Sequence, residues 1–255
     1  MRKSTKLVAI LGSLVGLSAA VLPSSSFASV SVVSNENTVT LGIDNVLALA
    51  LVSGVAGDND VTYSNGTYSA TLDAGSTKSS FGTSTFRVTC NYIGSGSNSC
   101  LTYGWKVNAA SNNKAQIGGV DYATMEPTDP STNPAKIYSK SGTLSSSESN
   151  WQMRVAGSEK SVTINGNSYS TTPPTYAPGY NVLNLVPPGS IDDGEVVGGA
   201  TVVSGHTFQT INSVANTYIG DQEFTVTYGV STGGATPADT YTGTITYTLS
   251  LNAAS

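Results

Sequence analysis

The stretch DTYTGTITYTLSLN, residues 239–252, alternates between apolar side chains and hydroxyl-bearing side chains. Successive side chains of a β-strand point to opposite faces, so this pattern predicts one strand with a buried face and a solvated face. Threonine makes up nearly all of the solvated face, and it favours β geometry. The apolar face is expected to contain Tyr241, Ile245, Tyr247, Leu249 and Leu251.

The preceding run EFTVTYGV, residues 223–230, has a matching apolar set in Phe224, Val226, Tyr228 and Val230. A Gly/Pro-containing loop, STGGATPAD, joins it to the final stretch. The two runs are therefore predicted to pair as neighbouring antiparallel strands.

Strand-like runs recur along the chain, and turn-forming residues separate them. Within one of them the Asn65-Gly66 pair predicts a type I′ hairpin. Residues 43–57 could form a helix or a strand, and no other stretch shows a capped helical period. We therefore predict an all-β fold, a single antiparallel β-sandwich of immunoglobulin-like type. The runs are 38–43, 61–72, 80–93, 101–109, 150–157, 160–166, 180–186, 195–203, 223–230 and 239–252.

Residues 126–149 and 171–194 are rich in Pro, Ser and Thr. They are either ordinary long loops or crossover connections between sheets. Apolar residues that need a core interrupt both segments, so neither is expected to be an interdomain linker. We expect one β-sandwich surface domain over 29–255.

Residues 1–28 have the pattern of a signal peptide. Basic residues at positions 2, 3 and 6 precede an apolar run over 7–22, and Ser26 and Ala28 stand where a signal peptidase reads small residues. The apolar run is shorter than the roughly 20 residues that span a bilayer. We expect cleavage before Ser29, no membrane span after cleavage, and a secreted or cell-surface location.

The net charge of the chain limits the classes of partner that it is expected to bind. Residues 1–28 hold three of the 11 basic residues and none of the 16 acidic ones, which leaves a mature net charge of −8. An acidic chain with no basic cluster is not expected to bind nucleic acid or anionic lipid. Only 11% of residues are charged, which suits an extracellular β-protein whose solubility comes from Ser, Thr, Asn and Gly.

The two cysteines, Cys90 and Cys100, flank the loop NYIGSGSNS. An even cysteine count in a secreted chain predicts a disulfide bond. A closed loop of this length is worth roughly 3 kcal/mol through the entropy of the denatured chain.

The sequence contains few of the residue patterns that form catalytic sites. His206 is the single histidine, and no GxSxG nucleophile motif accompanies it. Two cysteines and one histidine do not make a zinc site, and no pattern predicts a cofactor. A carboxylate pair for glycan hydrolysis is not indicated either. We expect a protein that is not an enzyme.

Two acidic turns, GDND at 57–60 and IDDGE at 191–195, could donate oxygens to calcium. Neither matches a known calcium loop, and runs of this kind are usually solvated. We predict no metal site, and calcium binding at 58–60 and 192–195 stays open.

Two segments, 84–111 and 224–250, carry a resemblance to a family. Each runs strand, loop, strand, and the second strands contain Trp105-Lys106-Val107 and Tyr247-Thr248-Leu249. This order resembles the WxL-type surface domains of Gram-positive bacteria and related exported β-sandwich proteins of small-genome bacteria, with Val107 and Tyr247 departing from the Trp-x-Leu pattern. The resemblance implies a WxL-like sandwich that associates non-covalently with the cell wall, with a cell-wall glycan or an envelope protein as partner and a role in adhesion.

The motif residues Trp105, Val107, Tyr247 and Leu249 allow two interpretations. They either contact a ligand or pack in the core. Trp105 shares its strand parity with Val107, and Tyr247 shares its parity with Leu249. Large aromatic residues dominate sandwich cores, so core packing is favoured.

The final hairpin also resembles those of fimbrial and spore-coat-U-like subunits. Such a subunit would self-assemble by donating an N-terminal strand, and residues 29–43 contain alternating apolar residues that could serve. A pilin-like structural subunit is therefore the alternative to a wall-binding protein, and a secreted glycan-active enzyme is less favoured.

Overall fold

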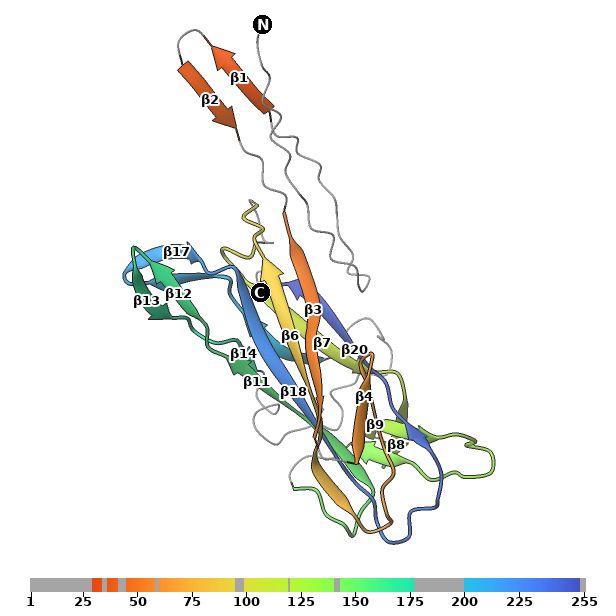
Figure 1. Ribbon diagram of the computed structural model, residues 1–255. Helices are drawn as coiled ribbons and strands as arrows, with labels where there is room; N and C mark the ends of the chain where they lie inside the picture. Colours follow the sequence, from red (N-terminus) through yellow and green to blue (C-terminus); the bar gives the residue numbers. More distant parts are fainter. Residues whose placement is uncertain are drawn as a thin grey trace, which may run out of the picture.

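The computed structural model describes residues 29–33, 36–40, 45–57, 60–94, 99–118, 120–139, 143–176 and 200–252. All regular elements within these ranges are β-strands (Figure 1). The all-β prediction is therefore confirmed, and no helix of the described part is long and apolar enough to cross a membrane. The predicted signal peptide, residues 1–28, lies outside the described residues.

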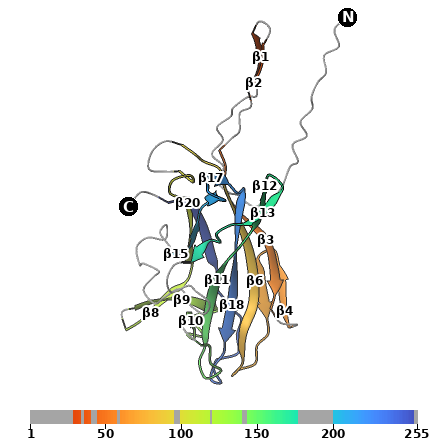
Figure 2. The same ribbon diagram turned by 90° about the vertical axis from the view of Figure 1, so that its left-hand side faces the viewer.

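The larger sheet is mixed, so the prediction of purely antiparallel sheets is wrong. Strand β10 runs parallel to β11, whereas the other pairings of this sheet are antiparallel. Its central strands β11, β18 and β6 lie side by side along the length of the molecule (Figure 2). In order across the sheet the strands are β19 (Tyr241–Thr242), β9 (Val120–Pro127), β10 (Ile137–Ser139), β11 (Asn150–Ser158), β18 (Asp221–Ser231), β6 (Thr77–Cys90) and β3 (Leu47–Ala56), with β8 (Lys114–Ile117) beside β9.

A second, antiparallel sheet contains β14 (Thr175–Tyr176), β15 (Ala200–Gly205), β7 (Trp105–Ser111) and β20 (Ile245–Leu251), in that order. Four two-stranded hairpins complete the described strands. They are β1 (Ser29–Val33) with β2 (Glu36–Thr40), β4 (Val61–Ser64) with β5 (Thr67–Ala70), β12 (Ser161–Ile164) with β13 (Asn167–Ser170), and β16 (Phe208–Ile211) with β17 (Val214–Tyr218).

The two large sheets share one hydrophobic core. The Phe86 ring of β6 stacks on Phe224 of β18 at 5.2 Å and lies 4.7 Å from the Tyr247 ring of β20, measured between ring centroids. Burying each large apolar side chain contributes about 1.5–3 kcal/mol, so this cluster is the main source of stability. Its fully buried members include Val88, Trp105, Val107, Met153, Val155, Val202, Val203, Phe224 and Val226.

The hairpin of β4 and β5 confirms the predicted type I′ turn, with φ of 48° at Asn65 and 82° at Gly66. Its tyrosines pack against glycines of the larger sheet. A Cβ at Gly82 would lie 2.2 Å from the Tyr68 ring, and one at Gly54 would lie 2.0 Å from the Tyr63 ring. The two glycines therefore make room for the hairpin on the sheet.

The final stretch forms two strands, where the sequence predicts one. Strand β19 pairs with β9 in the larger sheet, whereas β20 pairs with β7 in the four-stranded sheet. The chain changes sheets at Gly243, where an added Cβ would lie 2.9 Å from the Cγ atom of Met125. The predicted faces are confirmed, because the tyrosine and aliphatic side chains pack against the core and Thr242, Thr244, Thr246 and Thr248 are exposed.

The predicted pairing of 223–230 with the final stretch is wrong. Strand β18 pairs with β11 on one side and β6 on the other, so both of its edges are occupied. The matching apolar faces of β18 and β20 meet across the core instead, where the hydroxyls of Tyr228 and Tyr247 are 2.8 Å apart. Matched parity shows that two strands share a core, and it does not show that they share a sheet.

Several of the predicted segments differ from the strands that the structure contains. Residues 43–57 contain a strand, β3, and the strand expected at 101–109 begins only at Trp105. The predicted connection 126–149 contains β10 of the larger sheet, whereas 171–176 contains the edge strand β14. The run 180–186 and the rest of that second connection, up to residue 194, lie outside the described residues.

Candidate functional site

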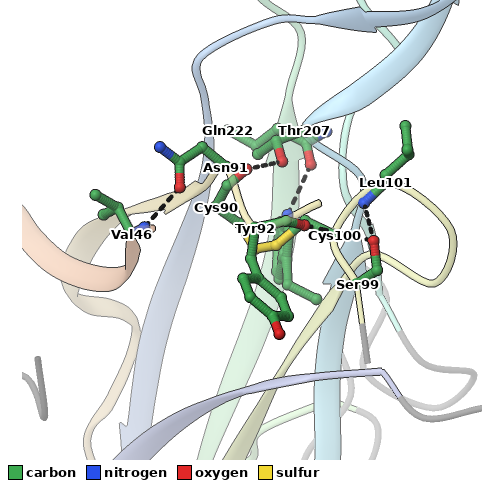
Figure 3. The surroundings of a disulfide bond; sticks show 10 residues. Val46, Cys90, Asn91, Tyr92, Ser99, Cys100, Leu101, Thr207 and Gln222 are labelled. Carbon is green, nitrogen blue, oxygen red and sulfur yellow. Dashed lines mark hydrogen bonds between the residues drawn. A yellow bond between two sulfur atoms is a disulfide. The ribbon is translucent and has the colours of Figure 1, made fainter. Parts of the chain in front are cut away.

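The predicted disulfide between Cys90 and Cys100 is present, with the two Cα atoms 6.0 Å apart and both residues fully buried. Figure 3 shows the hydrogen bonds among the residues around this disulfide. The Thr207 hydroxyl donates to the Cys90 carbonyl, and the Cys100 amide donates to the Tyr92 carbonyl at 2.9 Å. The bond therefore fastens the end of β6 to the start of the segment that leads into β7.

Trp105, the first of the predicted motif residues, is 0% exposed, and its indole N–H donates to Oε1 of Gln222 at 3.0 Å. The Gln222 amide in turn donates to the Thr172 carbonyl at 3.0 Å. Val107 on the same strand is also fully buried. A ligand at the surface has no access to either side chain.

Tyr247 and Leu249, the other two motif residues, are partly buried and pack against the core. The Tyr247 hydroxyl meets that of Tyr228, and it also points to the Met153 sulfur at 3.9 Å. Burial raises the pKa of Tyr228 to about 12 and holds the pKa of Tyr247 well above its ordinary value of 10.0.

This pair predicts a loss of stability at alkaline pH. In the unfolded chain both phenols release their protons near pH 10, while the folded chain keeps them protonated. The stability that the pair contributes is therefore fully present below pH 10 and is lost as the pH rises toward 12, by about 2 kcal/mol for Tyr228 alone. Urea denaturation at pH 8, 10 and 11 measures this slope.

The matched control for this prediction carries Tyr228→Phe and Tyr247→Phe together. It removes both ionisable groups and keeps the rings, so its free energy of unfolding should fall less steeply above pH 10. If the two proteins lost stability with the same slope, other groups would be responsible.

His206, the single histidine, lies beside Gly104, where an added Cβ would come within 2.7 Å of its Nδ1 atom. Its backbone carbonyl accepts a hydrogen bond from Nε2 of Gln209 at 3.0 Å. Its ring has no hydrogen-bond partner among the described residues. The described part of the chain thus brings no base or nucleophile to this imidazole.

The acidic turn at 58–60 is described only at Asp60, which forms an ion pair with Lys78 at 2.9 Å. The hydrogen bond from Lys78 lowers the pKa of that carboxyl group. Residues 58–59 and the second turn, 192–195, lie outside the described residues. In the part of the chain that the structure describes, no three His, Cys, Asp or Glu side chains gather as a metal site.

The sequence does not predict a hollow of about 430 Å³ that lies over β11, β18 and β6. Its lining residues include Gln152 and Arg154, whose parity on β11 is opposite to that of the buried Trp151, Met153 and Val155. The hollow therefore lies on the outer face of the larger sheet. Hydroxyl groups form most of the remaining wall, from Ser79, Ser80, Thr83, Thr225 and Thr227.

Two polar groups of this hollow lack partners among the described residues. Gln152 is only 6% exposed, and its enclosed Oε1 atom accepts no hydrogen bond. Arg154 is exposed, and no carboxylate of the described residues lies within ion-pair distance of its guanidinium group. An unpaired buried acceptor costs about 1–3 kcal/mol, which is unusual in a folded protein.

No family model, curated protein or solved structure matches this chain. The described part contains a buried disulfide, a core that includes the motif residues, and a polar hollow on the outer face of the larger sheet.

Proposed function

We propose that this protein is an exported, non-enzymatic cell-surface protein that associates non-covalently with the cell envelope, through peptidoglycan or a surface partner. The disulfide of Cys90 and Cys100 is the observation that carries export, because such bonds form and persist in oxidising compartments. The signal-peptide pattern over 1–28 and the sparse charge of the chain support the same location.

The proposed fold is a single β-sandwich of WxL-like or immunoglobulin-like type. The shared core of the two large sheets supports it. The motif positions Trp105 and Val107 are fully buried, so the resemblance at these residues supports a similar core rather than a ligand contact. We therefore expect attachment to the envelope through the exposed, hydroxyl-rich faces of the sheets.

A pull-down of the purified mature chain, 29–255, on insoluble peptidoglycan tests this function. We expect the protein to sediment with peptidoglycan and to remain there at moderate salt, because hydroxyl-mediated contacts are screened less than ion pairs between exposed charges. Cellulose, a neutral glycan, is the control matrix. Absence of retention on peptidoglycan and on whole cell envelopes would contradict the proposal.

The alternative, a pilin-like subunit that assembles by strand donation, requires residues 29–43 to be free to pair with another copy. Residues 29–33 and 36–40 instead pair with each other as β1 and β2. Electron microscopy at increasing protein concentration separates the two functions, because filaments in the absence of any envelope material would favour the subunit.

A further inference from the structure

We propose that the hollow over β11, β18 and β6 is a binding subsite for a sugar that carries a carboxylate. The identity of that sugar as part of a wall glycan rests on the proposed function, but the chemistry of the subsite rests on the hollow itself. Its volume of about 430 Å³ lies within the range of small-ligand sites.

Arg154 supplies the charge selectivity. A guanidinium group presents parallel N–H donors that match a carboxylate, and an exposed arginine at the edge of a hollow keeps this capacity for a ligand. The other described arginine on this face, Arg87, is already committed to Asp221 at 3.0 Å and Glu223 at 2.6 Å. A carboxylate that approaches this face is therefore directed to Arg154.

Gln152 and the hydroxyl groups supply the contacts for a polyhydroxylated ring. A turn of the Gln152 carboxamide toward the hollow would let its unpaired Oε1 accept a hydrogen bond from a sugar hydroxyl, which removes the cost of the buried orphan. The hydroxyl groups of Thr83 and Thr227 are hydrogen-bonded to one another, with their oxygens 3.2 Å apart. Each hydroxyl can form a further hydrogen bond as donor or acceptor. Polar groups of both kinds are thus fixed on three rigid strands.

A matched pair of sugars tests the subsite. N-acetylmuramic acid carries a carboxylate that N-acetylglucosamine lacks, and both are titrated into the folded mature chain while amide signals are followed by NMR. We expect saturable shifts at residues of β11 and β18 with the acidic sugar, and binding at least about tenfold weaker with the neutral one, since hydrogen bonds to charged groups are the stronger ones.

Three variants assign the effect to side chains. Arg154→Ala should weaken binding of the acidic sugar by about tenfold or more and abolish the preference for it, while Lys106→Ala removes one positive charge from the four-stranded sheet and should leave binding unchanged. Gln152→Met keeps the volume of the side chain and removes its acceptor, so it should fold normally and bind severalfold more weakly.

The sugar titrations and the peptidoglycan pull-down together distinguish failure of the subsite from failure of the proposed function. Equal binding of both sugars, no binding of either, or an unchanged affinity in Arg154→Ala would overturn the subsite. If peptidoglycan retained the wild-type protein while neither sugar bound, envelope association would stand and the subsite would fail. If neither sugar bound, and neither peptidoglycan nor whole cell envelopes retained the protein, both proposals would be wrong.

Discussion

Replacement of Trp105 by alanine is expected to lower the free energy of unfolding by about 3–5 kcal/mol, the usual range when a large aromatic side chain is removed from a core. The indole is 0% exposed, so its deletion leaves a cavity between the sheets. It also leaves Oε1 of Gln222 without its donor. Urea denaturation followed by circular dichroism measures the loss.

The control for Trp105→Ala is Ile117→Ala. Ile117 is an apolar residue that is 50% exposed, so its removal should change the free energy of unfolding by only about 0.5 kcal/mol. If Trp105→Ala kept the stability of the wild type but lost retention on peptidoglycan, Trp105 would be a ligand contact and its place in the core would be wrong.

Loss of the disulfide is expected to cost about 3 kcal/mol, because the bond closes a short loop in the denatured chain. The variant with both Cys90→Ala and Cys100→Ala should unfold at a correspondingly lower urea concentration. Reduction of the wild type should produce a similar shift, since it breaks the same bond.

The double variant is also the control for the reducing agent. It has no bond to break, so addition of dithiothreitol should leave its unfolding midpoint unchanged. A wild-type midpoint that stayed unchanged although mass spectrometry showed both thiols to be reduced would show that the bond does not contribute to stability.

Features that depend on neighbouring residues could be predicted from the sequence. The Asn65-Gly66 turn is one, because the backbone conformation with positive φ that it needs is a property of those two residues. The faces of the final strand are another, because alternation is read directly from residues 245–251. The sequence does not predict the hairpin of β16 and β17, since its turn at Asn212 and Ser213 has positive φ without the usual glycine.

Features that depend on sheet order could not be predicted. The alternation of 223–230 shows which side chains face inward, but the neighbours of β18 are β11 and β6, which are distant in sequence. The hollow also depends on sheet order and could not be predicted. The polar parity of Gln152 and Arg154 is visible in the sequence, whereas their position beside Thr83 and Thr227 follows only from the order of three strands.

The sheet order also governs when the chain can fold. Arg87 of β6 and Glu223 of β18 are hydrogen-bonded across 136 residues, and Thr246 reaches Asn112 across 134. Neither large sheet can close until the ribosome has made the strands near the carboxyl terminus. Such distant pairings fold slowly, on the scale of milliseconds to seconds. A chain that is exported as proposed would thus reach the translocation machinery before either large sheet has formed.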